Sequence, residues 1–219
     1  MFKVAVVSST SGSVLNAVLK EKYIDDRVST IISDRNCGAI EVGQSNKKSI
    51  QQFITDDSRV FSDLLLEYFE ANPHDLVISF YTKLFYGDLL KELEGKFLNF
   101  HPSILPACRG IDGFGDTLKS GSLFIGATVH FIDETIDTGY PIIQSAFPFN
   151  PELSTLENRH CVFVAQCRMF IQTVRWFEQE RLRWENYDRP YLVGGKYAIS
   201  EFSPNLDFDL AINYVPNQL

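Results

Sequence analysis

Short apolar runs alternate with helix-like segments along the first half of the chain. Residues 2–7 (FKVAVV) form a short apolar run that suits a strand buried on both faces, and residues 28–33 (VSTIIS) and 75–80 (DLVISF) repeat the strand pattern. The first run leads through SSTSGS into a helix, and residues 58–72 carry apolar side chains at helical spacing before Pro73. This alternation predicts an α/β fold, with an open, mainly parallel twisted sheet and helices on both faces.

The middle of the chain predicts a change in strand direction. Residues 97–100 (FLNF) are predicted to form another inner strand after a helix near 86–93. Residues 126–134 and 141–149 predict a hairpin with IDTG in its connection. The sheet is therefore expected to carry an antiparallel edge hairpin.

The last third begins with a long predicted helix over residues 153–182. Ser154 and Glu157 have the spacing of a capping box at its start, and at about 1.5 Å per residue it would run to roughly 40 Å. The segment after it mixes aromatics with Gly, Pro and acids, and a small hairpin around residues 194–195 is expected. We expect one main domain, residues 1–185, with residues 186–219 as a C-terminal extension packed on it.

Composition excludes several classes of protein. A formal charge of −8 argues against a phosphate-backbone surface, so no nucleic-acid partner is expected. The longest apolar runs fall far short of the ~20 residues of a membrane span, and the N-terminus has no signal-peptide pattern, so we expect a cytoplasmic protein without membrane contact. The four cysteines form no CxxC pair and have no His at ligand spacing; they are predicted to be free thiols, mostly buried, with no metal site.

Polar residues gather where the predicted strands end. In an open parallel sheet, ligands bind beyond the carboxyl ends of the strands, where SSTSGS, residues 81–83 and the Asn99–His101 segment would all lie. The hairpin connection adds Asp137. An asparagine amide can donate to a developing oxyanion, and a histidine oriented by a carboxylate can move a proton, which suits acyl transfer through a tetrahedral intermediate.

The segment around His101 has two other interpretations. His101 could be an ordinary hydrogen-bonded histidine at a strand end. Ser103 could be a nucleophile, but the chain lacks a G-x-S-x-G elbow. A dinucleotide-dependent oxidoreductase is disfavoured because no G-x-G-x-x-G follows the first strand.

Three segments closely resemble one family. NFHPSILP (99–106), GATVHF (126–131) and DTG (137–139) are similar to the glycinamide ribonucleotide transformylase family and its formyltransferase relatives. The similarity runs from residue 2 to about 185. It implies a Rossmann-like formyltransferase fold and a catalytic domain over residues 1–185. It also implies the catalytic residues Asn99, His101 and Asp137, which would transfer a formyl group from 10-formyltetrahydrofolate to a primary amine without a metal, with His130 in support.

The resemblance also implies binding residues. The folate cosubstrate would contact the segment before the catalytic strand and the loop carrying Asp137; these residues are Tyr81, Thr82, Lys83, Leu84, Phe85, Asp133 and Glu134. An ordinary strand exit with a solvated lysine is the alternative for the first group. The acceptor would contact Ser11, Gly12, Ser13, Arg109 and Gln166.

The acceptor residues depart from the family pattern. The family loop G-N-G-S-N reads TSGSV here, at residues 10–14, and could equally be a plain strand-to-helix turn. Gln166 and Cys167 stand where the family has Glu-His, and the Arg-Gly of residues 109–110 resembles the sugar and transfer-RNA formyltransferases. Two small anionic acceptors therefore remain open, glycinamide ribonucleotide and a nucleotide-linked amino sugar. Methionyl-tRNA is disfavoured by the negative charge and the lack of a basic C-terminal domain. A 10-formyltetrahydrofolate hydrolase and a non-catalytic binding paralogue are the alternatives, and a homodimer is left open.

Overall fold

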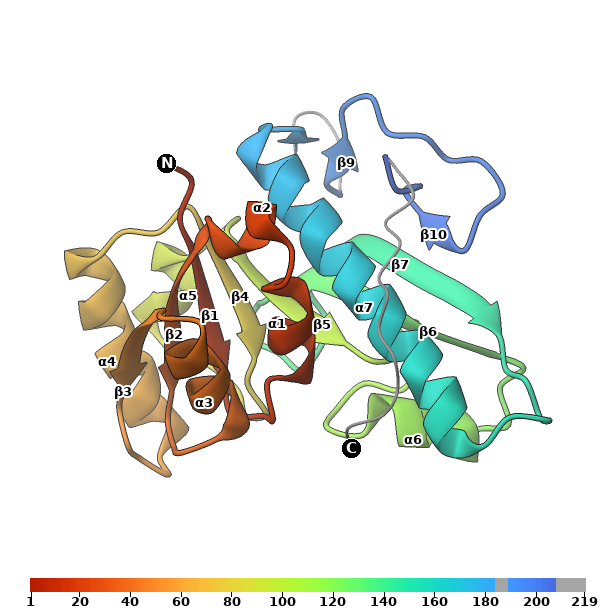
Figure 1. Cartoon of the computed structure of the whole chain (residues 1–219), viewed down its shortest axis with the longest axis horizontal. Coiled ribbons are helices and arrows are strands. Elements are labelled where there is room, and N and C mark those ends of the chain that lie inside the picture. The colour runs from red at the N-terminus through yellow and green to blue at the C-terminus, as the bar shows by residue number, and fades with distance from the viewer. Residues whose placement is uncertain (184–188, 208–219) are drawn as a thin grey trace.

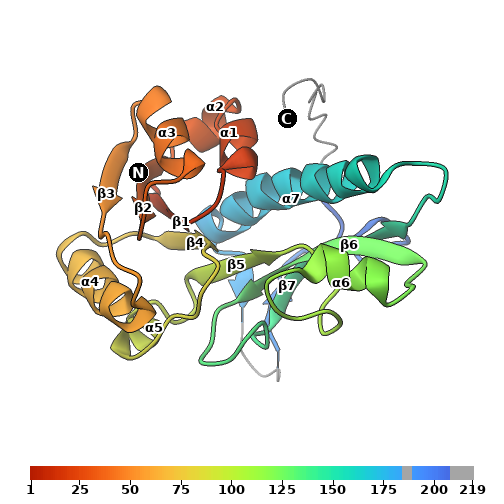
Figure 2. The same cartoon turned by 90° about the horizontal axis from the view of Figure 1, so that it is seen from below.

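The computed structural model describes residues 1–183 and 189–207 of the 219-residue chain. Within them, an eight-stranded sheet in the order β10-β7-β6-β5-β4-β1-β2-β3 forms the centre of the molecule (Figures 1 and 2). The strands are β1 (Val4–Ser8), β2 (Val28–Ser33), β3 (Ser49–Gln52), β4 (Leu76–Phe80), β5 (Phe97–His101), β6 (Phe124–Phe131), β7 (Pro141–Pro148) and β10 (Phe202–Ser203); β8 (Leu182–Arg183) and β9 (Tyr191–Leu192) form a separate pair. The helices are α1 (Ser13–Val18), α2 (Lys22–Asp25), α3 (Gly38–Ser45), α4 (Ser58–Ala71), α5 (Asp88–Glu92), α6 (Gly113–Lys119) and α7 (Thr155–Glu178).

The parallel half of the sheet runs from β3 to β5. Strand β1 pairs in parallel with both β2 and β4, and its side chains alternate between the two faces. Val4 and Val6 pack with α1, α3 and α7, whereas Ala5 and Val7 pack with α4 and α5. Helices therefore cover both faces, as Figure 2 shows, and the predicted α/β class is confirmed.

The antiparallel half begins where β6 pairs with β5. This pairing sets Asn99 directly opposite His130, and β7 then pairs antiparallel with β6, which confirms the predicted hairpin. The hairpin does not end the sheet, because β10 adds one more antiparallel strand along β7.

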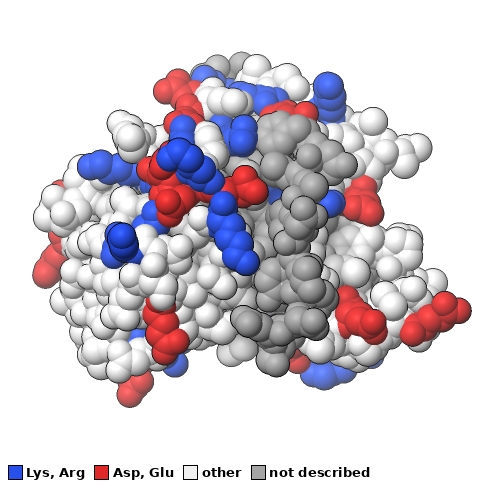
Figure 3. All heavy atoms as spheres, in the orientation of Figure 1, with Lys and Arg blue, Asp and Glu red and all other residues white. Residues whose placement is uncertain are grey.

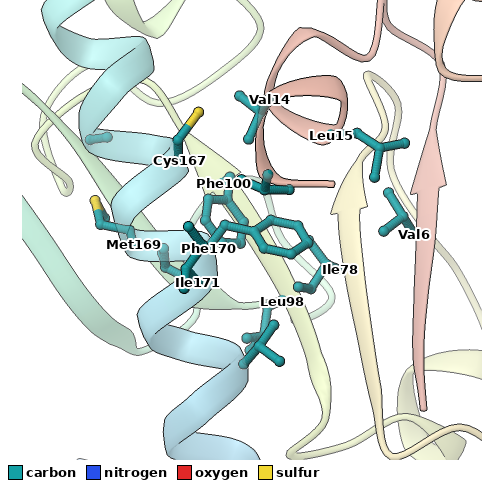
Figure 4. Close-up of a cluster of buried hydrophobic side chains, with 14 of the residues drawn as sticks. Val6, Val14, Leu15, Ile78, Leu98, Phe100, Cys167, Met169, Phe170 and Ile171 are labelled. Atoms are coloured by element: carbon teal, nitrogen blue, oxygen red, sulfur yellow. The ribbon is translucent and has the colours of Figure 1, made fainter. Parts of the chain in front are cut away.

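Helix α7 crosses one face of the sheet (Figure 1). The predicted capping box is present, with Ser154 accepting from the Glu157 N–H and Glu157 accepting from the Ser154 N–H. In Figure 4, Phe170 lies between α7 and the strands near Phe100. The helix spans 24 residues and ends at Glu178, earlier than the predicted residue 182, because Glu180 takes a left-handed backbone with φ of 50°. Its length is about 36 Å.

The prediction of a hairpin around residues 194–195 is wrong. A turn exists there, with the Gly195 N–H donating to the Leu192 carbonyl. However, Leu192 pairs with Leu182, which precedes it in the chain, and not with a strand after the turn. Phe202, further along, joins the main sheet instead. Both Leu192 and Phe202 are buried, so their burial against the main core decides the pairing. The boundary predicted at residues 185 and 186 lies outside the described residues and stays a prediction.

The cysteines are free thiols, as predicted, but only Cys167 is buried; Cys37 and Cys108 are half-buried and Cys161 is exposed. The prediction that most are buried is wrong, because Cys161 lies on the outer side of α7 and the other two lie in loops. None of the helices in the described part of the chain combines the length and apolar composition needed to cross a membrane. On the face in Figure 3, acidic and basic side chains are interspersed, with no broad field of one sign.

Candidate functional site

A cleft of about 620 Å³ opens at the carboxyl ends of β1, β4 and β5. The loops that leave these strands line it, together with the 132–140 loop and one side of α7. Strand β1 lies between β4 and β2 in the sheet, and the chain leaves β1 and β4 toward opposite faces. The loops after these two neighbouring strands therefore diverge and leave space between them. The segments predicted to meet at one edge of the sheet do meet there.

Asn99 enters the cleft from β5. Its side-chain Nδ2 lies 3.2 Å from His130 Nε2 and donates to Asp137 Oδ1 at 3.3 Å. His130 Nδ1 lies 2.8 Å from the Phe131 carbonyl, which can only accept, so Nδ1 carries the proton and Nε2 accepts from Asn99. Both amide hydrogens of Asn99 therefore have partners, and both contacts are long for hydrogen bonds.

His101 ends the same strand, two residues on and on the same side of the sheet. Its Nε2 donates to the Cys108 carbonyl at 2.7 Å, which leaves Nδ1 facing Asp137 Oδ2 at 3.4 Å. Burial lowers the pKa of His101 below its ordinary value, although the Cys108 carbonyl and the Asp137 carboxylate both act to raise it. The imidazole is therefore neutral near pH 7, and Nδ1 is the atom that can take up a proton.

Asp137 comes from the loop between β6 and β7 and takes a left-handed backbone with φ of 50°. Its Oδ2 accepts from the Gly110 N–H at 2.8 Å, and Oδ1 faces His130 and Asn99. Burial acts to raise its pKa, but the contact with His130, the hydrogen bond from the Gly110 N–H and the nearby His101 together outweigh burial and hold the pKa below its usual value. Asp137 is thus a carboxylate at neutral pH.

The loop after His101 is fixed to β6 and β7 by polar side chains. Thr128 Oγ1 donates to the Ser103 carbonyl and accepts from the Leu105 N–H, while Gln144 Nε2 donates to the Leu105 carbonyl. Ser103 Oγ donates to the Ala107 carbonyl at 2.8 Å, and Ser103 is fully buried. A hydroxyl held inside the loop in this way cannot reach a substrate.

The residues predicted to bind folate lie along one wall, and Tyr81 through Phe85 all line the cleft. Ser9 Oγ accepts from the Thr82 N–H at 3.2 Å, which ties this segment to the loop after β1. Lys83 Nζ lies 3.3 Å from Asp34 Oδ2, a carboxylate oxygen that Arg35 also contacts at 2.6 Å, and it donates to the Asp56 carbonyl.

Of the two other residues predicted to bind folate, one lines the cleft and the other does not. Asp133 lines the cleft and accepts from the Thr135 N–H and the Thr138 hydroxyl. Glu134 is exposed and is not among the lining residues.

Most, but not all, of the residues predicted to bind the acceptor line the cleft. Ser11, Gly12, Ser13 and Gln166 line the cleft, whereas Arg109 is exposed and does not. Gly12 has a φ of 73°, and a Cβ there would lie 2.7 Å from the Ala39 Cα, so the backbone itself requires glycine. Gln166 Nε2 lies 3.5 Å from the Phe100 carbonyl, between the two catalytic candidates of β5.

Arg159 and Ile111 are among the lining residues that the sequence analysis did not name. Arg159 lies seven positions before Gln166 on α7, so the helical repeat could have found it. Ile111 lines the cleft while remaining 87% exposed, and no sequence pattern marks it.

Cys167, next to Gln166, does not face the cleft. It is fully buried, beside α1 in Figure 4, and burial raises the pKa of its thiol to about 12. Among residues 1–183 and 189–207, no three His, Cys, Asp or Glu side chains are grouped as metal ligands.

These groups suit one kind of chemistry. The site combines an amide donor, a neutral imidazole and an ionised carboxylate at the edge of a roomy cleft. Such a set can stabilise an oxyanion and move a proton during acyl transfer to an amine.

Comparison with known proteins gives consistent matches. The formyl transferase family matches residues 2–172. Phosphoribosylglycinamide formyltransferase of Bacillus subtilis is 31% identical over 170 residues, which cover 73% of this chain and 87% of that protein. The protein of the same name from Haemophilus influenzae is 26% identical over 203 residues, which cover 89% and 95%.

Solved structures agree. Glycinamide ribonucleotide transformylase 1 from Symbiobacterium toebii superposes with a TM-score of 0.80 at 28% identity, over 88% of this chain and 94% of that one. A formyltetrahydrofolate deformylase from Pseudomonas putida KT2440 has a TM-score of 0.74 at 20% identity, over 88% and 71%, and shares the fold alone.

Proposed function

The chain belongs to the formyl transferase family, and we propose that it transfers the formyl group of 10-formyltetrahydrofolate to the primary amine of glycinamide ribonucleotide. The observation that carries the proposal is the convergence of Asn99, His101 and Asp137 at one edge of the cleft. The names of the relatives from Haemophilus influenzae and Bacillus subtilis favour this acceptor.

The reaction forms one bond to the formyl carbon and breaks another. The amine nitrogen attacks the formyl carbon, and the carbonyl oxygen becomes an oxyanion in a tetrahedral intermediate. Asn99 Nδ2 would turn one N–H to this oxyanion, releasing its long contact with Asp137. The bond from carbon to the folate nitrogen then breaks, and the formyl group remains on the acceptor.

The proton released by the amine has to reach the folate nitrogen. His101 Nδ1 would take it up, because Nε2 already donates to Cys108. The imidazolium so formed lies beside the Asp137 carboxylate, whose attraction stabilises it because both side chains are largely buried. His101 then returns the proton to the leaving nitrogen.

A nucleotide-linked amino sugar is the second candidate acceptor. Val14 is buried and apolar where the family loop ends in asparagine, and Gln166 presents an amide where the family has a carboxylate. Both departures lie on the acceptor side, while the three catalytic residue types are all present. A changed acceptor with an unchanged reaction would produce this pattern.

The test is a folate absorbance assay with 10-formyltetrahydrofolate and each acceptor offered separately. We expect turnover with glycinamide ribonucleotide; turnover with the amino sugar alone would replace it as the acceptor. Folate consumed with formate released and no formylated acceptor would make the protein a hydrolase.

Variants separate catalysis from folding. Asn99→Ala and His101→Ala should each lower kcat by about 100-fold or more. Asn16→Ala removes an exposed asparagine of α1 outside the cleft and should retain activity. Folding of all three is checked by circular dichroism. A folded Asn99→Ala protein with wild-type turnover would refute the catalytic assignment, and no turnover by the wild type with either acceptor would favour a non-catalytic paralogue. The cytoplasmic location and the homodimer stay predictions.

A further inference from the structure

Arg159 is a cation of the cleft that the catalytic scheme leaves without a role. It lies in the first turns of α7, lines the cleft and is exposed. Its guanidinium carbon lies 5.5 Å from the centre of the Phe114 ring, a cation–π contact that fixes the group at the cleft wall. Within residues 1–183 and 189–207, no carboxylate forms an ion pair with Arg159.

The other charged side chains that line the cleft have partners. Lys83 is paired with Asp34, and its ammonium also donates to a backbone carbonyl. Asp133 accepts from the 135–138 turn, and Asp137 belongs to the catalytic group. Of the lining residues that the structure describes, Arg159 therefore offers the positive charge that a ligand can use.

The position of Arg159 sets its distance from the reacting atoms. Gln166 lies two turns further along α7, about 10.5 Å by helical rise, and meets the carbonyl of Phe100 between Asn99 and His101. Arg159 is therefore remote from the formyl carbon. This position suits contact with a part of the acceptor that is several bonds away from its amine.

We propose that Arg159 binds the phosphate group of the amine acceptor. This inference rests on the proposed function, whose two candidate acceptors both carry a phosphate, and it names the residue that binds that group. A guanidinium presents two parallel N–H donors that match phosphate oxygens, and such charge-assisted bonds are among the stronger ones in proteins. In a chain of net charge −8, an anionic acceptor gains most from a local cation.

The experiment pairs a protein change with a substrate change. Formyl transfer is measured with glycinamide ribonucleotide and with its dephosphorylated ribonucleoside, and with a nucleotide-linked amino sugar and the free sugar. Arg159→Ala should lower kcat/KM for the phosphorylated acceptor by about 10- to 100-fold, mainly through KM, and leave the dephosphorylated acceptor unchanged. Arg159→Lys keeps the positive charge but lacks the two parallel N–H donors, so its kcat/KM for the phosphorylated acceptor should lie between those of the wild type and Arg159→Ala. Arg183→Ala, which removes an arginine of β8 outside the cleft lining, is the matched control.

The outcomes separate this inference from the proposed function. Equal losses on both forms of the acceptor, or no loss on the phosphorylated form, would overturn the role of Arg159 while transfer by the wild type upholds the function. If the wild type transfers to neither acceptor, the proposed function fails. Calorimetric titration with the same two phosphorylated compounds then tests whether Arg159 binds their phosphate. Binding that weakens in Arg159→Ala but not in Arg183→Ala supports it; absent or unchanged binding refutes it.

Discussion

Gly113→Ala tests whether the position of His101 determines the reaction rate. A Cβ at Gly113, in the first turn of α6, would lie 2.8 Å from His101 Cε1 and still closer to Nε2, so the imidazole has to move. The movement breaks the bond from Nε2 to the Cys108 carbonyl, at a cost of about 1–3 kcal/mol. The higher helix propensity of alanine offsets about 1 kcal/mol of this loss in the free energy of unfolding. The net loss of stability is about 0–2 kcal/mol, whereas a shift of about 1 Å at a catalytic group can cost about 100-fold in rate.

The matched control is Gly115→Ala, on the same helix. Its Cβ would lie 2.6 Å from Asp112 Cγ, and the Asp112 side chain is 58% exposed, so it can swing into water. The lost N-cap bond costs about 1 kcal/mol, which the helix propensity of alanine offsets. Steady-state formyl transfer and thermal unfolding are measured for both variants. Wild-type kcat/KM in Gly113→Ala, or an equal loss in Gly115→Ala, would refute the reasoning.

Three further changes probe the electrostatics and the helix start. Asp137→Asn removes a carboxylate that raises the pKa of His101, so the acid limb of kcat/KM, already below about 6.5, should move to lower pH; an unmoved limb in a pH–rate series contradicts this. Asp34→Asn removes the buried carboxylate that pairs with Arg35 at 2.6 Å and with Lys83 at 3.3 Å, and it should cost about 1–3 kcal/mol in urea unfolding at pH 7. Because the pKa of Asp34 is lowered by folding, its stabilisation is present above pH 3.8 and lost below it, so wild type and variant should converge in acid. Ser154→Ala removes the capping box and should lower stability by about 1 kcal/mol without changing KM; a changed KM contradicts a purely structural role.

The parts of the fold that the sequence predicts are those set by burial. Strand β2 has the predicted bounds, Val28–Ser33, because five of its six residues are buried and the β-branched Val28, Ile31 and Ile32 mark the strand in the sequence. Strand β3, Ser49–Gln52, was missed because it lies at the sheet edge and reads SIQQ, with little apolar pattern. The end of α7 was missed because the left-handed backbone of Glu180 carries no residue signal such as glycine. Pairing of β10 with β7 joins residues 57 positions apart (202 and 145), which no local pattern encodes.

The same distinction divides the site. The side chains of Asn99 and His101 point to the same side of β5. The pairing of β5 with β6 places His130 against Asn99, so the sheet itself brings these three side chains together. That is why a short motif suffices to predict them.

The residues that face the acceptor are under weaker constraint. Arg159 and Gln166 share a face of α7 only because seven residues make nearly two turns, and other side chains could stand at both positions without disturbing the buried face of the helix. A change of acceptor therefore costs the fold little, whereas the positions of Asn99 and His130 depend on the pairing of β5 with β6. The chemistry of the acceptor has to be inferred from the charges along α7, and among the lining residues described the positive charge available there is that of Arg159.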